Sequence, residues 1–275
     1  MGELQNFNIH SYDLFGTTAL VRFPEKFKRS NKKKFAENLL KEQKGIKTVL
    51  EKSGDIKGRL RKLSTTFLAG EDTKEVLYRE NNCVFRFNID KTYFSPRLSN
   101  ERKEIVSLIK KNEVVLVMFA GVAPFSIVIA KNSKAKKVYS NELNREANKY
   151  AELNIRLNKL KDKIELVSGD IKKVTDKIIK GEKFEGNIIP KKFDVIVMPR
   201  PQLKDSFLEQ AFKLSKKGTR VYYYDFCKID EIDDIIEKVK KQAEDFKIKI
   251  KILKTKHAGD IAPYKVRLRV DFIVL

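Results

Sequence analysis

The chain of 275 residues contains 59 lysine and arginine residues against 37 aspartate and glutamate residues, a formal net charge of +22 at pH 7. Hydrophobic residues make up 41% of the sequence, which is enough for a packed core and excludes a wholly disordered chain. Only two cysteines are present, Cys83 and Cys227, so the sequence contains neither a disulfide framework nor the paired-cysteine spacing of a structural zinc site.

The excess of positive charge indicates a polyanionic partner such as nucleic acid, because each phosphate that a basic side chain neutralises releases counterions. A solvated, lysine-rich surface is the alternative. Lysine-rich proteins usually carry compensating glutamate, and this sequence does not. The charge therefore favours a nucleic-acid partner.

The longest apolar run, residues 114–130, contains Gly121 and Pro124 and is too short for a membrane span. The first ten residues lack the basic and then apolar pattern of a secretory signal. We expect a soluble cytoplasmic protein that does not associate with membranes.

The first part of the chain mixes short strands with one helix. Residues 19–23 form an apolar run that ends at Pro24, and residues 84–89 alternate apolar and polar side chains, so both predict strands. Residues 34–42 place Phe35, Leu39 and Leu40 on one helical face. We expect a small α+β module over residues 1–95.

From residue 99 onward, predicted strands and helices alternate. Asn100 is expected to cap a first helix, and helices are also expected after Gly121 and over residues 144–160, 174–179, 206–214 and 232–246. Strands are expected over residues 114–119, 137–140, 164–167, 195–198, 220–224, 247–253 and 266–274. This alternation predicts an α/β domain with a parallel sheet covered by helices on both faces. The short link before the last strand predicts one antiparallel strand.

Three strand ends in this domain carry residues suited to a nucleoside. Gly121 lies where the first strand becomes a loop, Glu142 follows the second strand, and Asp170 follows the third. Glycine lets a ligand approach the backbone, and an acid at a strand end suits a ribose diol. A simple turn and a solvated acid are the alternatives for each residue alone. Ala123 interrupts the GxGxxG pattern, so the sequence favours an S-adenosyl-L-methionine pocket over a dinucleotide site.

Residues 92–102, TYFSPRLSNER, are followed by MFAGVAPFSI at residues 118–127, and LAGE and APY occur at residues 68–71 and 262–264. These motifs resemble the archaeal and eukaryotic tRNA (guanine-37-N1)-methyltransferase family, which includes related aminocarboxypropyltransferases of the wybutosine pathway. The resemblance covers nearly the whole chain. It implies a Rossmann-like class I methyltransferase domain over residues 96–275, S-adenosyl-L-methionine as cofactor, the tRNA anticodon stem-loop as partner, and methylation of guanine N1 at position 37. An N-terminal module that grips the tRNA elbow in the family is not recognised, so we expect the chain to begin with the family's second module.

The resemblance also assigns roles to residues. Glu101 matches the family's general base, and Arg61 matches an arginine that stabilises negative charge on guanine O6; their alternatives are a first-turn helix acid and a phosphate contact. The residues that match cofactor contacts or flank them are Tyr93, Phe119, Ala120, Gly121, Val122, Pro124, Phe125, Glu142, Leu143, Asp170 and Pro199. His10 and His257 are isolated, so we expect no metal. We also expect a monomer.

Two departures from the family bear on the reaction. Val117 stands where the family has an aspartate, and Pro199-Arg200-Pro201 replaces an Asn-x-Pro motif. Both positions concern the methionyl side of the cofactor. They leave open aminocarboxypropyl transfer, methylation of a wyosine intermediate, or a tRNA-binding paralogue without transfer activity.

Overall fold

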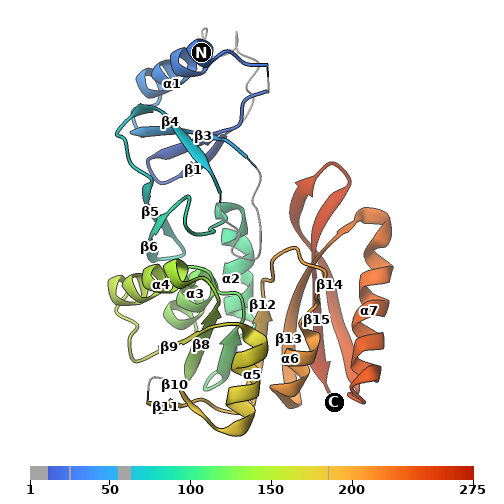
Figure 1. Cartoon of the computed structure of the whole chain (residues 1–275). Helices are drawn as coiled ribbons and strands as arrows, with labels where there is room; N and C mark the ends of the chain where they lie inside the picture. The colour runs from blue at the N-terminus through green and yellow to red at the C-terminus, as the bar shows by residue number, and fades with distance from the viewer. Residues whose placement is uncertain (1–11, 25, 55–62, 185) are drawn as a thin grey trace.

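The computed structural model describes residues 12–24, 26–54, 63–184 and 186–275 (Figure 1). Its first part is a four-stranded sheet in the order β1-β2-β3-β4. The strands span Tyr12–Phe15, Thr18–Val21, Thr48–Lys52 and Thr65–Gly70, and helix α1 spans Arg29–Glu42. Phe35, Ala36 and Leu39 of α1 are buried against β2 and β3. The helix predicted over residues 34–42 and the strand predicted over residues 19–23 are confirmed.

A hairpin follows, made of β5 (Glu75–Glu80) and β6 (Cys83–Asn88), which confirms the predicted strand at residues 84–89. It packs on helix α4 (Arg145–Leu157) of the large sheet. Asn154 of α4 accepts a hydrogen bond from the backbone of Arg86 at 2.7 Å, and Asn158 accepts one from Val84 at 3.0 Å. The hairpin is thus tied to the large sheet. The domain boundary between residues 1–95 and 96–275 stays a prediction.

The second part is a seven-stranded sheet in the order β14-β15-β13-β12-β7-β8-β9. Its strands in chain order are β7 (Val114–Val117), β8 (Lys137–Glu142), β9 (Ile164–Ser168), β12 (Phe193–Met198), β13 (Ser215–Lys228), β14 (Ile250–Ala262) and β15 (Lys265–Val274). Five strands run parallel, and β15 lies antiparallel between β13 and β14, as the short final link predicted. A two-stranded β10–β11 ribbon (Lys183–Phe184 and Asn187–Ile188) precedes β12.

Helices cover both faces of this sheet because successive strand residues are buried on both sides. Val115 and Val117 of β7 join one hydrophobic cluster, whereas Leu116 and Met118 join the other. The helices are α2 (Ser99–Ser107), α3 (Pro124–Asn132), α4, α5 (Ile171–Lys180), α6 (Leu208–Lys213) and α7 (Ile232–Asp245). The predicted α/β class is confirmed. No helix in the described part of the chain is long and apolar enough to cross a membrane.

The expectation that Asn100 caps the first helix of this domain is wrong. A 3₁₀ turn, Pro96–Leu98, runs directly into α2, which begins at Ser99 and has Leu98 at its N-cap. Asn100 therefore lies inside the first turn of the helix. Helix α4, predicted over residues 144–160, is capped by Asn144, whose side chain accepts from the backbone N–H of Glu146 at 3.0 Å.

Candidate functional site

A cavity lies at the carboxyl ends of β7, β8, β9 and β12, where the sheet order reverses between β7 and β12. This is where open α/β sheets bind ligands. It brings together most of the predicted cofactor residues, namely Tyr93, Phe119, Ala120, Gly121, Pro124, Phe125, Glu142, Leu143, Asp170 and Pro199. These residues come from five separate segments of the chain, so only folding assembles them.

Glu142 is held by two backbone amides at the end of β8. Its Oε2 accepts from Gly121 N–H at 2.7 Å, and its Oε1 accepts from Asn144 N–H at 2.7 Å. Glu142 therefore fixes the loop after β7, and it also lines the cavity.

The loop after β7 has an unusual backbone. Phe119, Gly121 and Ala123 have φ angles of 56°, 58° and 66°, in the left-handed region. Such conformations are costly for residues with a side chain and concentrate at ligand sites. A Cβ at Gly121 would lie 3.3 Å from the carbonyl oxygen of Tyr93, so the glycine also permits a close approach of two backbones. The loop shape is thus fixed by tertiary contacts.

Asp170 lies at the N-cap of α5, and its carboxylate accepts from the backbone N–H of Lys172 at 3.0 Å. Apolar side chains of Phe119, Ile171 and Phe207 line the cavity near it. The rings of Phe119 and Phe207 meet edge to face, with centroids 4.9 Å apart. An aromatic and aliphatic wall beside one acid suits a purine ring with an amino group.

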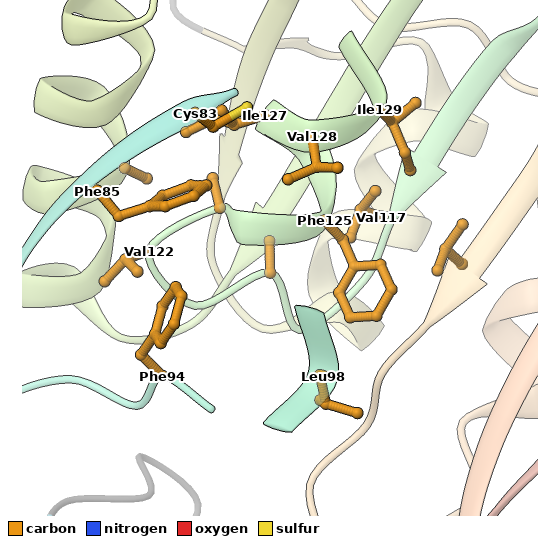
Figure 2. Packing of buried hydrophobic residues seen from close by; sticks show 14 of the residues in the cluster. Cys83, Phe85, Phe94, Leu98, Val117, Val122, Phe125, Ile127, Val128 and Ile129 are labelled. Atoms are coloured by element: carbon orange, nitrogen blue, oxygen red, sulfur yellow. The ribbon is translucent and has the colours of Figure 1, made fainter. Parts of the chain in front are cut away.

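Val122 is the one described member of the predicted cofactor set that does not line the cavity. It is fully buried, and Figure 2 shows its side chain in the core beside Phe85 and Phe94. It shares the loop with Gly121 but contributes packing rather than cavity surface. Its proposed contact with the cofactor is not supported by this placement.

Glu101 lies on α2 in a buried ion-pair network and is 5% exposed. Its Oε1 accepts from Tyr224 Oη at 2.9 Å and from Arg269, and its Oε2 accepts from Lys256 Nζ at 2.8 Å. Glu101 does not line the cavity, but Tyr224 does. Burial, more than the nearby Glu101 carboxylate, raises the pKa of Tyr224 well above its ordinary value, so this hydroxyl stays protonated and donates. Arg61 lies outside the described residues.

The Pro199-Arg200-Pro201 segment has a structural explanation. Arg200 is 3% exposed and pairs with Asp225 of β13. Its Nη1 also donates to three loop carbonyls at 3.0 Å, those of Pro201, Leu203 and Asp205. Arg200 thereby fixes the loop that places Pro199 in the cavity wall. Val117 is fully buried in the sheet core and does not line the cavity.

Sequence reasoning missed several cavity residues, among them Arg102, Asn141, Phe207 and Arg267. Arg102 pairs with Glu80 where both side chains are almost fully buried. Tyr222, Tyr223 and Tyr224 are all buried strand residues, and only Tyr224 lines the cavity. Period-two alternation along β13 marks Tyr222 and Tyr224 as sharing a face, but not which of them reaches a ligand.

Comparisons with known proteins agree with this site. The TRM5/TYW2 methyltransferase domain model matches residues 76–251, and the TYW2 N-terminal domain model matches residues 2–73. The chain belongs to the TRM5/TYW2 methyltransferase family. This membership confirms the resemblance of its motifs, and the family uses S-adenosylmethionine.

Two relatives and three structures place the chain within the TRM5/TYW2 family. It is 32% identical to the tRNA (guanine(37)-N(1))-methyltransferase Trm5b of Pyrococcus abyssi over 99% of this chain and 77% of that protein. It is 31% identical to the tRNA (guanine(37)-N(1))/4-demethylwyosine(37)-methyltransferase Taw22 of Nanoarchaeum equitans over 96% of this chain and 100% of that protein.

The structure of Pyrococcus abyssi Trm5b matches with a TM-score of 0.84 at 32% identity, covering 99% of this chain and 77% of that one. The complex of aTrm5 with tRNALeu matches with a TM-score of 0.82 at 28% identity, covering 100% of this chain and 75% of that one. The complex of Methanocaldococcus jannaschii Trm5 with adenosine matches with a TM-score of 0.78 at 27% identity, covering 99% of this chain and 74% of that one. The seven-stranded sheet is thus the methyltransferase sheet of the family.

The cavity residues fit an adenosyl group on this structure's own geometry. The fixed carboxylate of Glu142 suits a ribose diol, and the wall of Phe119, Ile171 and Phe207 suits a purine. Among the described residues, no group of three histidine, cysteine, aspartate or glutamate side chains is placed to hold a metal ion. The expectations of no metal and of a monomer stay predictions.

Proposed function

We propose that this TRM5/TYW2 family enzyme methylates guanine N1 at position 37 of tRNA, with S-adenosylmethionine as methyl donor. The observation that carries this proposal is the cavity at the sheet reversal, in which the amide-held Glu142 faces an aromatic wall. Relatives with tRNA (guanine(37)-N(1))-methyltransferase names match 99% of the chain. The bound sulfonium supplies an electrophilic methyl group.

The residues that line the cavity bind and position the donor. Glu142 holds the ribose, Asp170 and Leu143 bound the adenine, and Pro199 closes the methionyl side of the cavity. Tyr93, with Ala120 and Gly121 of the loop, completes the backbone wall. This arrangement places the donor and leaves one open side for a base, so the enzyme gains rate by positioning.

Glu101 remains our proposed acceptor for the proton of guanine N1. Because Glu101 lies behind the cavity wall, we propose that Tyr224 relays the proton: its oxygen accepts from N1 while its own O–H proton passes to Glu101 Oε1. Arg269 and Lys256 form ion pairs with Glu101 that fix its orientation. Arg61, which the family resemblance assigns to guanine O6, completes the proposal as charge stabiliser.

The substrate is proposed to be tRNA bound through its anticodon stem-loop. A formal charge of +22 favours a polyanion, and the related aTrm5 was solved with tRNALeu bound. We propose that the small α+β module of residues 1–95 supports the target nucleotide from the side opposite the sheet. A monomer is sufficient for this arrangement, because one chain supplies the whole cavity.

Incubation with unmodified tRNA transcript and donor labelled in the methyl or the carboxyl group tests the function. Methyl label in G37 transcript, and none in a G37→A transcript, supports the proposal. Methyl label that persists in the G37→A transcript contradicts the assigned position. No incorporation of either label supports a binding paralogue without transfer activity.

Aminocarboxypropyl transfer in the wybutosine pathway is the second candidate. Val117 lacks the acid that the family resemblance expects near the methionyl amino group, and Pro199 has no N–H to donate. Residues 2–73 also match the TYW2 N-terminal domain. In the same assay, carboxyl label without methyl label would support this reaction. A wyosine-containing tRNA as acceptor tests methylation of that intermediate, which the Taw22 relative is named for.

A further inference from the structure

Arg267 of β15 is a buried cation with an unusual environment. It is 8% exposed, and its guanidinium carbon lies 5.3 Å from the centroid of the Phe226 ring. In the described part of the chain, no carboxylate, carbonyl or side-chain oxygen lies within hydrogen-bond or ion-pair distance of its guanidinium. A guanidinium carries five N–H donors, and no nitrogen of Arg267 is among the fully buried, unpartnered atoms of the described residues, so these donors are open to a ligand in the adjoining hollows. The other buried arginines differ, because Arg102, Arg200 and Arg269 each pair with a carboxylate.

The position of Arg267 links two hollows of the molecule. One is the cofactor cavity; the other is a groove lined by residues of the N-terminal module, the loop at residues 92–97 and the β14–β15 hairpin. Arg267 lines both. Tyr93, Phe94, Ser95, Pro201 and Leu203 also line both, so the two hollows share a wall. A nucleotide that enters along the groove to meet the donor must pass this wall.

The strand is locally irregular at Arg267. In the β14–β15 pairing, His257 lies opposite Leu268 and Asp260 lies opposite Val266, so two residues of β14 face the single position of Arg267. One of the two is Gly259, with φ of +125°, and both Ala258 and Gly259 line the groove. This is a β-bulge, a feature that redirects a side chain beside active sites. On the other side, Phe226 is the strand partner of Arg267, and the guanidinium lies over its ring.

We infer that Arg267 reads the O6 and N7 edge of the target guanine with two parallel hydrogen bonds. This inference rests on the proposed function. A guanidinium is planar and presents two parallel N–H donors, and arginine paired with O6 and N7 is the commonest specific contact to guanine. Hydrogen bonds to O6 and N7 approach the base from the side of O6 opposite N1, so N1 stays free to face the donor and O6 keeps a second lone pair for Arg61. Adenine offers an amino donor at position 6 instead of an acceptor, and Arg267 therefore selects guanine.

A substrate change and a variant test the inference together. We compare G37 transcript with transcript carrying 7-deazaguanine at position 37, which keeps O6 and N1 and lacks the N7 acceptor. The enzymes are the full-length wild type, Arg267→Ala, and Lys251→Ala as a charge-matched control, since Lys251 lies exposed on the same hairpin. Each enzyme is measured for kcat/KM and for its Kd for S-adenosylhomocysteine.

We expect wild type and Lys251→Ala to lose about 5–150-fold in kcat/KM on 7-deazaguanine. On the G37 transcript, the kcat/KM of Arg267→Ala should fall below that of wild type by a similar factor or more. The variant should show no further loss of kcat/KM on the 7-deazaguanine transcript, and its Kd for S-adenosylhomocysteine should equal that of wild type. Equal wild-type rates on the two transcripts would overturn the inference, and this measurement needs no variant to fold. A weaker Kd in a folded Arg267→Ala variant would also overturn it, because Arg267 would then hold the donor. Wild type inactive on G37 transcript would instead contradict the proposed function.

Discussion

Replacement of Glu142 by glutamine tests the structural centre of the cofactor site. Glutamine keeps the shape of the side chain but turns one oxygen into an NH₂ donor. Whichever way the amide rotates, that donor faces the backbone N–H of Gly121 or of Asn144, and one of the two 2.7 Å hydrogen bonds is lost. A hydrogen bond to a charged acceptor contributes about 1.5–3 kcal/mol. The apo protein should therefore be destabilised by about that amount.

The same change should weaken cofactor binding. A ribose hydroxyl that bonds to the neutral amide instead of the carboxylate loses about 1.5–3 kcal/mol, which corresponds to roughly a 10–150-fold increase in Kd. Isothermal titration with S-adenosylhomocysteine measures the affinity. Thermal unfolding of the apo protein measures the stability, where each kcal/mol corresponds to roughly 2–4 °C.

Glu146→Gln is the matched control, because Glu146 lies four residues further along the chain, in the first turn of α4, and does not line the cavity. It should leave the Kd for S-adenosylhomocysteine within about twofold, a few tenths of a kcal/mol. If Glu142→Gln lowers the Tm but leaves Kd unchanged, Glu142 shapes the loop and does not hold ribose. If neither quantity changes, the reasoning from the two amide contacts is refuted.

Three further predictions concern carboxylates near the site. Glu101→Gln should lower kcat by about 10²–10⁴-fold with little change in the Kd for S-adenosylhomocysteine, because the variant removes a proton acceptor and not a cofactor contact; an equal loss in both would assign Glu101 a structural role. Glu104 is desolvated, which raises its pKa, but hydrogen bonds from Lys256 and Arg269 outweigh this and lower the pKa to about 2. The folded pKa lies below the unfolded one, so wild type should exceed Glu104→Gln in unfolding free energy by about 1–2 kcal/mol at pH 7. Urea titrations between about pH 4.5 and pH 2 measure this difference in unfolding free energy, which should disappear as the pH falls through that range. A difference that persists at pH 2 would contradict the lowered pKa of Glu104. Glu80→Ala should cost about 3–5 kcal/mol in the same titrations, because it leaves the Arg102 cation buried without its partner; a cost below about 1 kcal/mol would show that water reaches Arg102.

Much of the fold follows from local sequence patterns. The apolar runs at residues 114–117 and 195–198 are buried on both faces, and uninterrupted hydrophobicity is what a central parallel strand requires. The order of strand, loop, helix and acid also brought Gly121, Glu142 and Asp170 to one sheet edge, as predicted. Strands β1 and β3 of the first module were not predicted, because their sequences, YDLF and TVLEK, contain acidic residues and are not continuous apolar runs like that of β2.

The sequence alone determined the class of the domain, the carboxyl edge as the ligand site and the family to which the chain belongs. The tertiary structure decided which side chains face the ligand. Val122 turned into the core, Glu101 lies behind Tyr224, and Arg267 was directed to the cavity by a bulge. Sequence periodicity fixes the face of a strand on which a side chain lies, but its partners across 100 residues or more depend on packing between segments that only folding brings together.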